Sequence, residues 1–426
     1  MNATSRSAYG GSFLLETPDH IFTPEDFTEE HRAIAKATEE FWNQEVAPNL
    51  EAILQQDFGV LVRTLRKSAE LGLVATLVPE IYGGMEMDLA SAMIVTEGMA
   101  RDASYAVCHG AQAGIGALPV VLFGTEDQKQ RYVPRLASAE LVAAYCLTEA
   151  QAGSDPLNTR TRADLSADGS HYVLNGQKMW ITNGGFADLF TVFAKAGGEH
   201  FTAFLVERGW AGVTHGAEEK KMGLKGSSTT AVFFDNVRVP VENVLGQVGR
   251  GHIVAFNILN LGRLKLAMSA HGECREALMH SLRYARERKA FGKTIGEFGM
   301  IQQKLADMAV RMYANESMAY RITGHIQDLL PERELMRAVE EFAVECSLVK
   351  IFGSETLGFV TDEAVQIHGG YGYHQDYAVE RAYRDARIYR IFEGTNEINR
   401  ALASTMVLKR AGKGSITLPV VLDGST

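Results

Sequence analysis

The sequence predicts an α+β protein of several domains, with a β region between two helical regions. At 426 residues the chain is too long for one simple hydrophobic core, so two or three domains are expected. The hydrophobic pattern changes twice along the chain, from helical spacing to short β-rich runs and back to helical spacing. No GxGxxG motif joins a strand to a helix, so the pattern does not support a Rossmann nucleotide site.

These changes in pattern also set the expected boundaries. We expect an N-terminal extension over 1–22, a helical domain over 23–144, a β domain over 145–248, a second helical domain over 249–413 and a tail over 414–426. In the helical regions, apolar residues recur at three- and four-residue spacing, as in DFGVLVRTLRKSAELGLVATLVP. Pro48 and Pro79 interrupt the first of these regions.

The β region consists of short runs rich in Val, Phe and Thr, such as HYVLNGQKMWIT and TAVFFDNVRVP, separated by turn clusters. This pattern is typical of an antiparallel barrel or sandwich. Asn175-Gly176 and Asn183-Gly184 have the composition of hairpin turns.

Composition excludes several function classes. The net charge of −10 argues against nucleic acid or an anionic membrane as the main partner. No run reaches the roughly 20 apolar residues of a transmembrane helix, and the N-terminal residues make a poor signal peptide. We therefore expect a cytoplasmic protein, with the mitochondrial matrix as the second choice. The four cysteines form no CxxC or CxxH pair, so we expect neither a disulfide framework nor a metal site.

Two segments of the β region have the composition of ligand-binding loops. In AYCLTEAQAGSDP, main-chain amides around Gly153 and Ser154 can donate to a flat polar ring or a pyrophosphate; the alternative is a plain turn. In NGQKMWITNGG, we expect Trp180 and Thr182 on the same face of a strand. An aromatic plane beside a hydroxyl suits a flavin, whereas the alternative is that Trp180 lies in the core.

Basic residues gather near an expected helix-to-helix turn at Gly292. They are Arg286, Arg288, Lys289 and Lys293. Because arginine matches phosphate oxygens with paired hydrogen bonds, this cluster is a candidate phosphate site. The alternative is a solvated charged face, although the neighbouring Phe291 and Phe298 argue against a purely solvated one.

Glu393 has the surroundings of a general base. It lies between Phe392 and Gly394-Thr395 in an otherwise apolar run, where desolvation raises the pKa of a carboxyl group. Such a group can abstract a weakly acidic C–H proton, and Gly394 lets the backbone approach a ligand closely. The alternative is a glutamate at a helix N-terminus, favoured by capping and by the helix dipole.

Together these segments resemble the acyl-CoA dehydrogenase family over residues 22 to 413. The motifs YCLTEAQAGSD, NGQKMWITNGG, ERKAFGK, QIHGGYG and IFEGTNEINR occur in the order and spacing of the family. The stretches EEKKMGLKGSSTTAVFFDNVRVP and FNILNLGR resemble the long-chain and very-long-chain branch. The resemblance implies an N-terminal helical domain, a middle β-barrel and a C-terminal four-helix bundle.

The resemblance also implies FAD, extended between the barrel and the C-terminal bundle. The residues implied near the flavin and pyrophosphate are Tyr145, Leu147, Thr148, Gly153 and Ser154, with Trp180, Ile181 and Thr182 at the ring. Those implied at the adenosine-diphosphate half are Arg288, Phe291 and Phe298, together with Gln366, Gly369 and Gly370 of the partner subunit. Thr395 and Glu397 are implied to return to the cofactor in the first subunit.

The implied reaction is α,β-dehydrogenation of a fatty acyl-CoA, with Glu393 as the catalytic base. Ser154, Asn260 and Arg263 are implied to contact CoA, and Gly394 to pass beside the thioester. Val107 and Ala111, followed by Gly114 and Gly116, are implied to form an open, dry pocket for a C12–C18 chain. The implied electron acceptor is an electron-transfer flavoprotein docking near Trp180.

Two departures from the family pattern bear on these expectations. Ala150-Gln151 stand where the family has Pro-Gly, and Gly262 stands where one branch places its catalytic glutamate. Since the extra C-terminal domain of very-long-chain members is not seen, we expect a homotetramer rather than a dimer. The alternatives are an acyl-CoA oxidase that uses O₂ and a non-catalytic assembly protein with the same fold.

Overall fold

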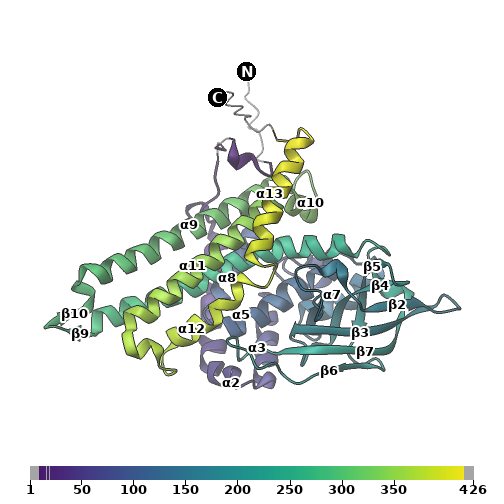
Figure 1. The fold of residues 1–426 in the computed structure, drawn as a ribbon, viewed down its shortest axis with the longest axis horizontal. Helices are drawn as coiled ribbons and strands as arrows, with labels where there is room; N and C mark the ends of the chain where they lie inside the picture. The colour runs from purple at the N-terminus through teal and green to yellow at the C-terminus, as the bar shows by residue number, and fades with distance from the viewer. Residues whose placement is uncertain (1–8, 16, 19, 417–426) are drawn as a thin grey trace, which may run out of the picture.

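The computed structural model describes residues 9–15, 17–18 and 20–416. Figure 1 shows a helical first part, a β domain at one end and long helices that extend to the other end. This arrangement confirms the predicted α+β fold with a β domain between two helical ones.

The first part is built from α-helices, most of which begin at a residue whose side chain caps the helix. Their bounds are α1 Glu29–Phe41, α2 Leu50–Leu54, α3 Phe58–Glu70, α4 Leu89–Met99, α5 Ala103–Gly110, α6 Leu118–Phe123 and α7 Glu126–Ala137. Asp88 accepts a hydrogen bond from the Ser91 N–H at the start of α4, and Asp102 accepts two at the start of α5. Between α5 and α6 the chain forms a π-helical turn, Ala111–Gly116, which is kinked at Gly114.

The β domain is one sheet of mixed pairing. Its strands are β1 Ala143–Cys146, β2 Arg162–Leu165, β3 His171–Thr182, β4 Leu189–Ala196, β5 His200–Glu207, β6 Val213–His215, β7 Thr229–Pro240 and β8 Val244–Leu245. They pair in the order β6-β7-β3-β2-β4-β5-β8. β1 lies off this path and pairs with β4, on the same side as β2. The expected antiparallel pairing is wrong at β1 and β2, which both run parallel to β4 because long connections, not tight turns, join them to it.

Neither predicted hairpin turn joins a hairpin. Asn175-Gly176 lies inside β3, where the register with β7 shifts; Gly176 has φ +153°, and a Cβ there would lie 2.5 Å from the Thr161 hydroxyl oxygen. Asn183-Gly184 forms a turn after β3, but the next strand, β4, does not pair with β3. The local composition was that of a turn, whereas sheet packing decided what each glycine does.

The C-terminal part consists of long helices and one small hairpin. Its helices are α8 Gly251–Glu287, α9 Gly299–Leu329, α10 Leu335–Glu341, α11 Ala343–His368, α12 Ala378–Ala386 and α13 Asn396–Gly412. Helix α11 packs against α8, α9 and α13, and α8 also contacts α4 and β5. The expected helix-to-helix turn at Gly292 is wrong: β9 Lys289–Ala290 and β10 Lys293–Thr294 form a hairpin, because Phe291 and Gly292 both adopt positive φ.

Candidate active site

Glu393 lies in the short connection that precedes α13, with its carboxyl group against α8. A Cβ built on Gly262 would lie 2.9 Å from Glu393 Oε2 and 3.2 Å from Oε1. Gly262 therefore leaves the space that the carboxyl group occupies. Glu393 itself has φ +57°, a conformation that a non-glycine residue adopts at a cost of order 1 kcal/mol or more and that often marks functional sites.

Side chains from three helices hold the main chain around Glu393. The Arg263 Nε of α8 donates to the Glu393 carbonyl oxygen at 3.1 Å. The Lys350 Nζ of α11 and the Asn399 Nδ2 of α13 donate to the Gly394 carbonyl oxygen at 2.8 and 2.7 Å. The connection is thus fixed on all sides even though it has no regular secondary structure.

The carboxyl group has the electrostatics of a base that works near neutral pH. Glu393 Oε2 is buried and has no hydrogen-bond partner among the described residues. Burial raises the pKa of Glu393 to about 7, against the opposing charges of Arg263 and Lys350. The helix-cap alternative is wrong, because Thr395 is the N-cap of α13 and accepts the Ile398 N–H at 3.3 Å.

Tyr145 of β1 brings the first cofactor loop to this carboxyl group. Its side chain is buried, and its hydroxyl donates to the Ala255 carbonyl oxygen of α8 at 3.3 Å. Burial raises the pKa of Tyr145 well above its usual value, and the charge of Glu393 adds to this rise. The loop that follows β1 therefore starts beside the base.

A buried ion pair ties the two predicted cofactor loops together, and sequence reasoning missed it. Lys178 of β3 donates to Glu149 Oε1 at 2.7 Å and to the Leu147 carbonyl oxygen at 3.1 Å. Glu149 also accepts from the Arg160 N–H at 2.6 Å and from the Thr161 N–H at 3.1 Å. Both residues stand inside the quoted motifs, so the motifs held the signal, but only the fold shows that the residues meet.

Trp180 and Thr182 end β3 beside this loop. The register with β7 shifts between Lys178 and Ile181, and Trp180 has φ +57°, so the simple alternation that placed Trp180 and Thr182 on one face does not hold here. Trp180 is 56% exposed, which rules out the alternative of a core tryptophan. Gly153 and Ser154 lie in the loop opposite; Ser154 is exposed, and a Cβ on Gly153 would meet nothing within 4 Å.

Arg288 lies at the other end of the molecule, in an open groove of about 490 Å³. The groove is lined by Tyr284, Arg288, Ile295, Ile367, His368, Gly369, Gly370, Tyr371 and His374. The Arg288 guanidinium lies 5.5 Å from the centre of the Tyr371 ring, and Gln366 directly precedes the groove residues on α11. Phe291, at the tip of the β9–β10 hairpin, is 95% exposed and contacts Phe298 edge to face.

The predicted cofactor residues therefore form two sets within one chain. Figure 1 shows the β9–β10 hairpin and the strands β2 to β7 at opposite ends of the molecule. Arg288, Gly369 and Gly370 belong to the first end, whereas Tyr145 and Trp180 belong to the β domain.

The structure shows where the residues expected around the substrate lie, but not their contacts with it. Arg263 is buried, and its Nη1 donates to Asn260 Oδ1 at 2.7 Å, so the contacts of Arg263 are made within the chain. Ala111 is buried in the π-helical turn, and Val107 is partly buried one turn earlier. The contacts of these residues with a CoA thioester stay predictions.

The dry pocket floor expected near Gly114 stays a prediction, although a charged group lies beside this glycine. The Lys265 Nζ donates to the Ala113 carbonyl oxygen at 3.1 Å and would lie 3.7 Å from a Cβ on Gly114. Gly116 serves helix packing, because a Cβ there would lie 2.8 Å from that of Ala143 in β1. Part of the small-residue pattern therefore reflects close packing.

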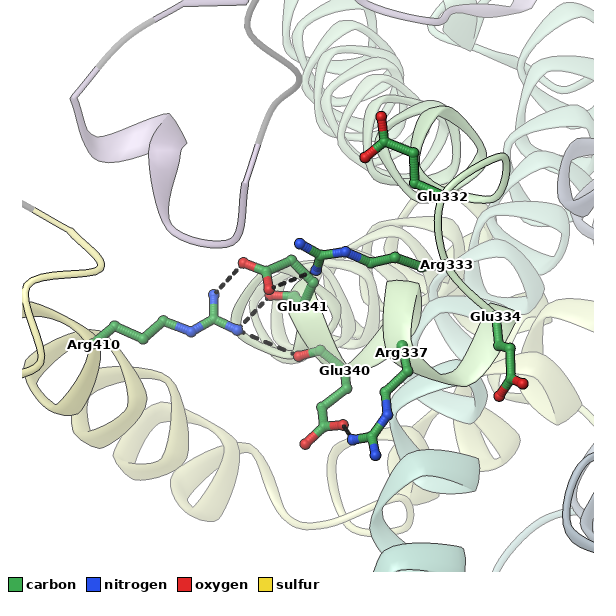
Figure 2. Close-up of a pocket in the computed structure, with 7 residues that line it drawn as sticks. All are labelled: Glu332, Arg333, Glu334, Arg337, Glu340, Glu341 and Arg410. Carbon is green, nitrogen blue, oxygen red and sulfur yellow. Dashed lines mark hydrogen bonds and ion pairs between the residues drawn. The ribbon is translucent and has the colours of Figure 1, made fainter.

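Two further features lie away from Glu393. The groove in Figure 2, about 670 Å³, is lined by Glu332, Arg333, Glu334, Arg337, Glu340, Glu341 and Arg410. Its charges pair with one another, as in the 3.2 Å contact of Arg333 with Glu341. Glu97, His271 and Glu316 could together face a metal ion, but Arg275 already donates to Glu97 at 2.7 Å.

Two helical stretches, Ala103–Phe123 and Gly251–Glu287, are long and apolar enough to cross a membrane. Both are mostly buried inside the fold, which is the position of core helices.

The fold and the site define a three-domain enzyme in which the buried carboxyl group of Glu393 lies against α8 of the C-terminal domain and near Tyr145 of the β domain. The N-terminal, middle and C-terminal domains of acyl-CoA dehydrogenase match residues 28–140, 144–237 and 249–408. The chain belongs to the acyl-CoA dehydrogenase family.

Known relatives align with most of the chain. A probable acyl-CoA dehydrogenase of Bacillus subtilis is 50% identical over 96% of this chain and 71% of its own length. The human mitochondrial very long-chain specific acyl-CoA dehydrogenase is 45% identical over 81% of this chain, which spans 53% of that protein. The crystal structure of an acyl-CoA dehydrogenase from Bacillus anthracis complexed with FAD has a TM-score of 0.95 at 49% identity, covering 96% of this chain and 74% of that one.

Proposed function

We propose that the chain oxidises fatty acyl-CoA to trans-2-enoyl-CoA, with Glu393 removing the α-proton. The observation that carries this proposal is the Glu393 carboxyl group, which is held opposite Gly262 with a buried, unpaired oxygen and a pKa of about 7. A base whose pKa lies near the working pH is suited to proton abstraction. The alternative of a non-catalytic assembly protein gives no reason to keep this strained and desolvated carboxyl group.

The cofactor is FAD, and the residues present fit it. Tyr145, Thr148, Trp180 and Thr182 would hold the flavin end beside Glu393. FAD supplies the acceptor for the β-hydride when it is bound. The Glu393 main-chain N–H makes no hydrogen bond within the described part of the chain, so it is free to donate to the thioester oxygen and stabilise the charge that develops there.

Assembly follows from the position of the two cofactor sets. Arg288, Gly369 and Gly370 lie too far from the β domain of their own chain, so a second copy supplies this half of the site. Arginine, two glycines that leave room for a ligand, and the aromatic ring of Tyr371 suit a diphosphate and a flat base. We propose a homo-oligomer on this ground, and a tetramer as its form.

For the substrate we propose a long acyl chain, and for the electron acceptor an electron-transfer flavoprotein. The small side chains of Val107 and Ala111, where the resemblance implies the acyl pocket, support the first proposal, as does the likeness to very long-chain specific relatives. The exposed Trp180 at the flavin end supports the second, since a partner can approach there. The bacterial relatives support a cytoplasmic location.

Anaerobic titration of the purified protein with palmitoyl-CoA tests the dehydrogenation. The flavin absorbance should bleach in the wild type and persist in Glu393→Gln, while both proteins release FAD on denaturation. A wild-type protein that binds FAD yet stays oxidised with every acyl-CoA of a C4–C20 series would overturn the proposal. Oxygen consumption during turnover without any other acceptor would favour an acyl-CoA oxidase instead.

A further inference from the structure

Lys350 is a completely buried lysine in the middle of α11, and it faces the connection that carries Glu393. Its ammonium group donates to the Gly394 carbonyl oxygen and to Asn396 Oδ1, both at 2.8 Å. Neither acceptor is a carboxylate. An ammonium group that is buried and hydrogen-bonded only to neutral oxygens is costly to desolvate, so ordinary packing does not account for it.

The contacts of Lys350 define the path of the chain immediately after the base. Gly394 has φ +82°, and its carbonyl oxygen is fixed from two sides, by Lys350 and by Asn399. Asn396 is held in turn by Ser354, whose Oγ accepts from Asn396 Nδ2 at 3.0 Å. Lys350 thus joins α11 to the first turn of α13 through the residues that follow Glu393.

We propose that Lys350 is a positioning residue for the catalytic base: it fixes the Gly394 carbonyl group so that the Glu393 carboxyl group stays opposite Gly262, and its charge favours the ionised form of that carboxyl group before the α-proton is abstracted. This inference rests on the proposed dehydrogenation. It adds a residue that none of the sequence motifs indicated.

The charges around Lys350 give the proposal a pH signature. Burial lowers the pKa of Lys350 to about 8, while the carboxylates of Glu393, Glu397 and Glu355 oppose this shift and Arg263 supports it. Glu393, with a pKa of about 7, is ionised above that pH. Lys350 is charged below its own pKa, so the flavin reduction rate should rise through about pH 7 and fall through about pH 8.

The test compares Lys350→Met and Lys350→Arg with the wild type. Flavin reduction by palmitoyl-CoA is followed by anaerobic stopped flow across pH 5.5–9.5. In Lys350→Met we expect the rate to be at least about tenfold lower, because the base is displaced. The acidic limb of the rate–pH profile, which reports the pKa of Glu393, should move upward by about one pH unit, because the nearby positive charge is lost. The alkaline limb should disappear. Lys350→Arg, which keeps the charge, should retain the position of the acidic limb.

Lys221→Met is the matched control. Lys221 is also a largely buried lysine, which donates to the Ser227 carbonyl oxygen at 2.6 Å and to Thr229 Oγ1 at 2.8 Å, but it lies in the β domain and Glu393 does not affect its pKa. Its loss should lower stability and leave both pH limbs in place.

Unchanged limbs in Lys350→Met, with a wild type that is reduced normally, would overturn the inference alone. A wild type that no acyl-CoA reduces would overturn the proposed function itself. If Lys350→Met does not fold, Lys350→Arg decides. This variant keeps the positive charge, so an acidic limb displaced by as much as one pH unit would show that the charge does not set the ionisation of Glu393, and would overturn the inference.

Discussion

Substitution of Gly262 by alanine places a single methyl group in the space of the Glu393 carboxyl group. The added Cβ would lie 2.9 Å from Glu393 Oε2 and 3.1 Å from its Cδ, about half an ångström closer than ordinary contact. The Glu393 side chain can rotate away because it is flexible, so folding should tolerate the change. Alanine even favours an α-helix interior over glycine by about 1 kcal/mol.

The Glu393 carboxyl group, however, would be displaced from its place opposite Gly262 and would no longer be directed at the same atom of the substrate. A displacement of about 1 Å at a reacting group lowers the rate by roughly 100-fold. For a shift of half that size we expect kcat/KM to fall roughly tenfold, which is about 1.4 kcal/mol of transition-state stabilisation. The expected signature of Gly262→Ala is therefore lower activity at equal or greater stability.

The assay combines steady-state kinetics with palmitoyl-CoA and urea unfolding of the same preparations. Gly299→Ala is the matched control, since a Cβ at that helical position meets nothing within 4 Å. It should keep full activity. If Gly262→Ala retains more than half of the wild-type kcat/KM, the Glu393 carboxyl group does not work from the position described.

Three further changes test other parts of the site. Glu393→Gln should slow flavin reduction by about 10²–10⁴-fold. Because burial raises the pKa of Glu393 from 4.5 to about 7, the wild type loses up to about 3 kcal/mol of stability as the pH rises from about 4.5 to about 7, and the glutamine variant should not, as urea unfolding at pH 4.5 and pH 8.5 would show. Mixing inactive Arg288→Ala with inactive Glu393→Gln subunits should restore activity if each site combines Arg288 of one copy with Glu393 of another; continued inactivity of verified mixed oligomers would contradict a shared site. Ala111→Phe should move the acyl length with the greatest kcat/KM to shorter chains, and an unchanged length profile would remove Ala111 from the pocket wall.

The sequence predicted those features that depend on neighbouring residues. The helical spacing, the β-rich runs and their order are local, and they led to the correct domain order. The chemistry of Glu393 was also readable, because an isolated carboxyl group among apolar residues and glycine already indicates desolvation. The choice between a base and a helix cap was not readable, since both alternatives use the same residues.

Contacts between distant segments could be decided only by the tertiary structure. Glu149 meets Lys178, Gly262 meets Glu393, and Lys350 meets Gly394 across 29, 131 and 44 positions of the chain. The same holds for the β3 bulge at Trp180, where pairing with β7 overrides strand alternation.

By itself, then, the sequence determined the order of the domains, the family motifs and the type of group that we propose as the base, because periodicity and composition act over a few residues. The tertiary structure decided which charges surround Glu393, which glycine leaves room for it, and that the Arg288 groove lies at the far end of its own chain. The reason is physical. Burial, electrostatic fields and close packing depend on distances in space, and the number of residues between two positions in the sequence does not determine those distances.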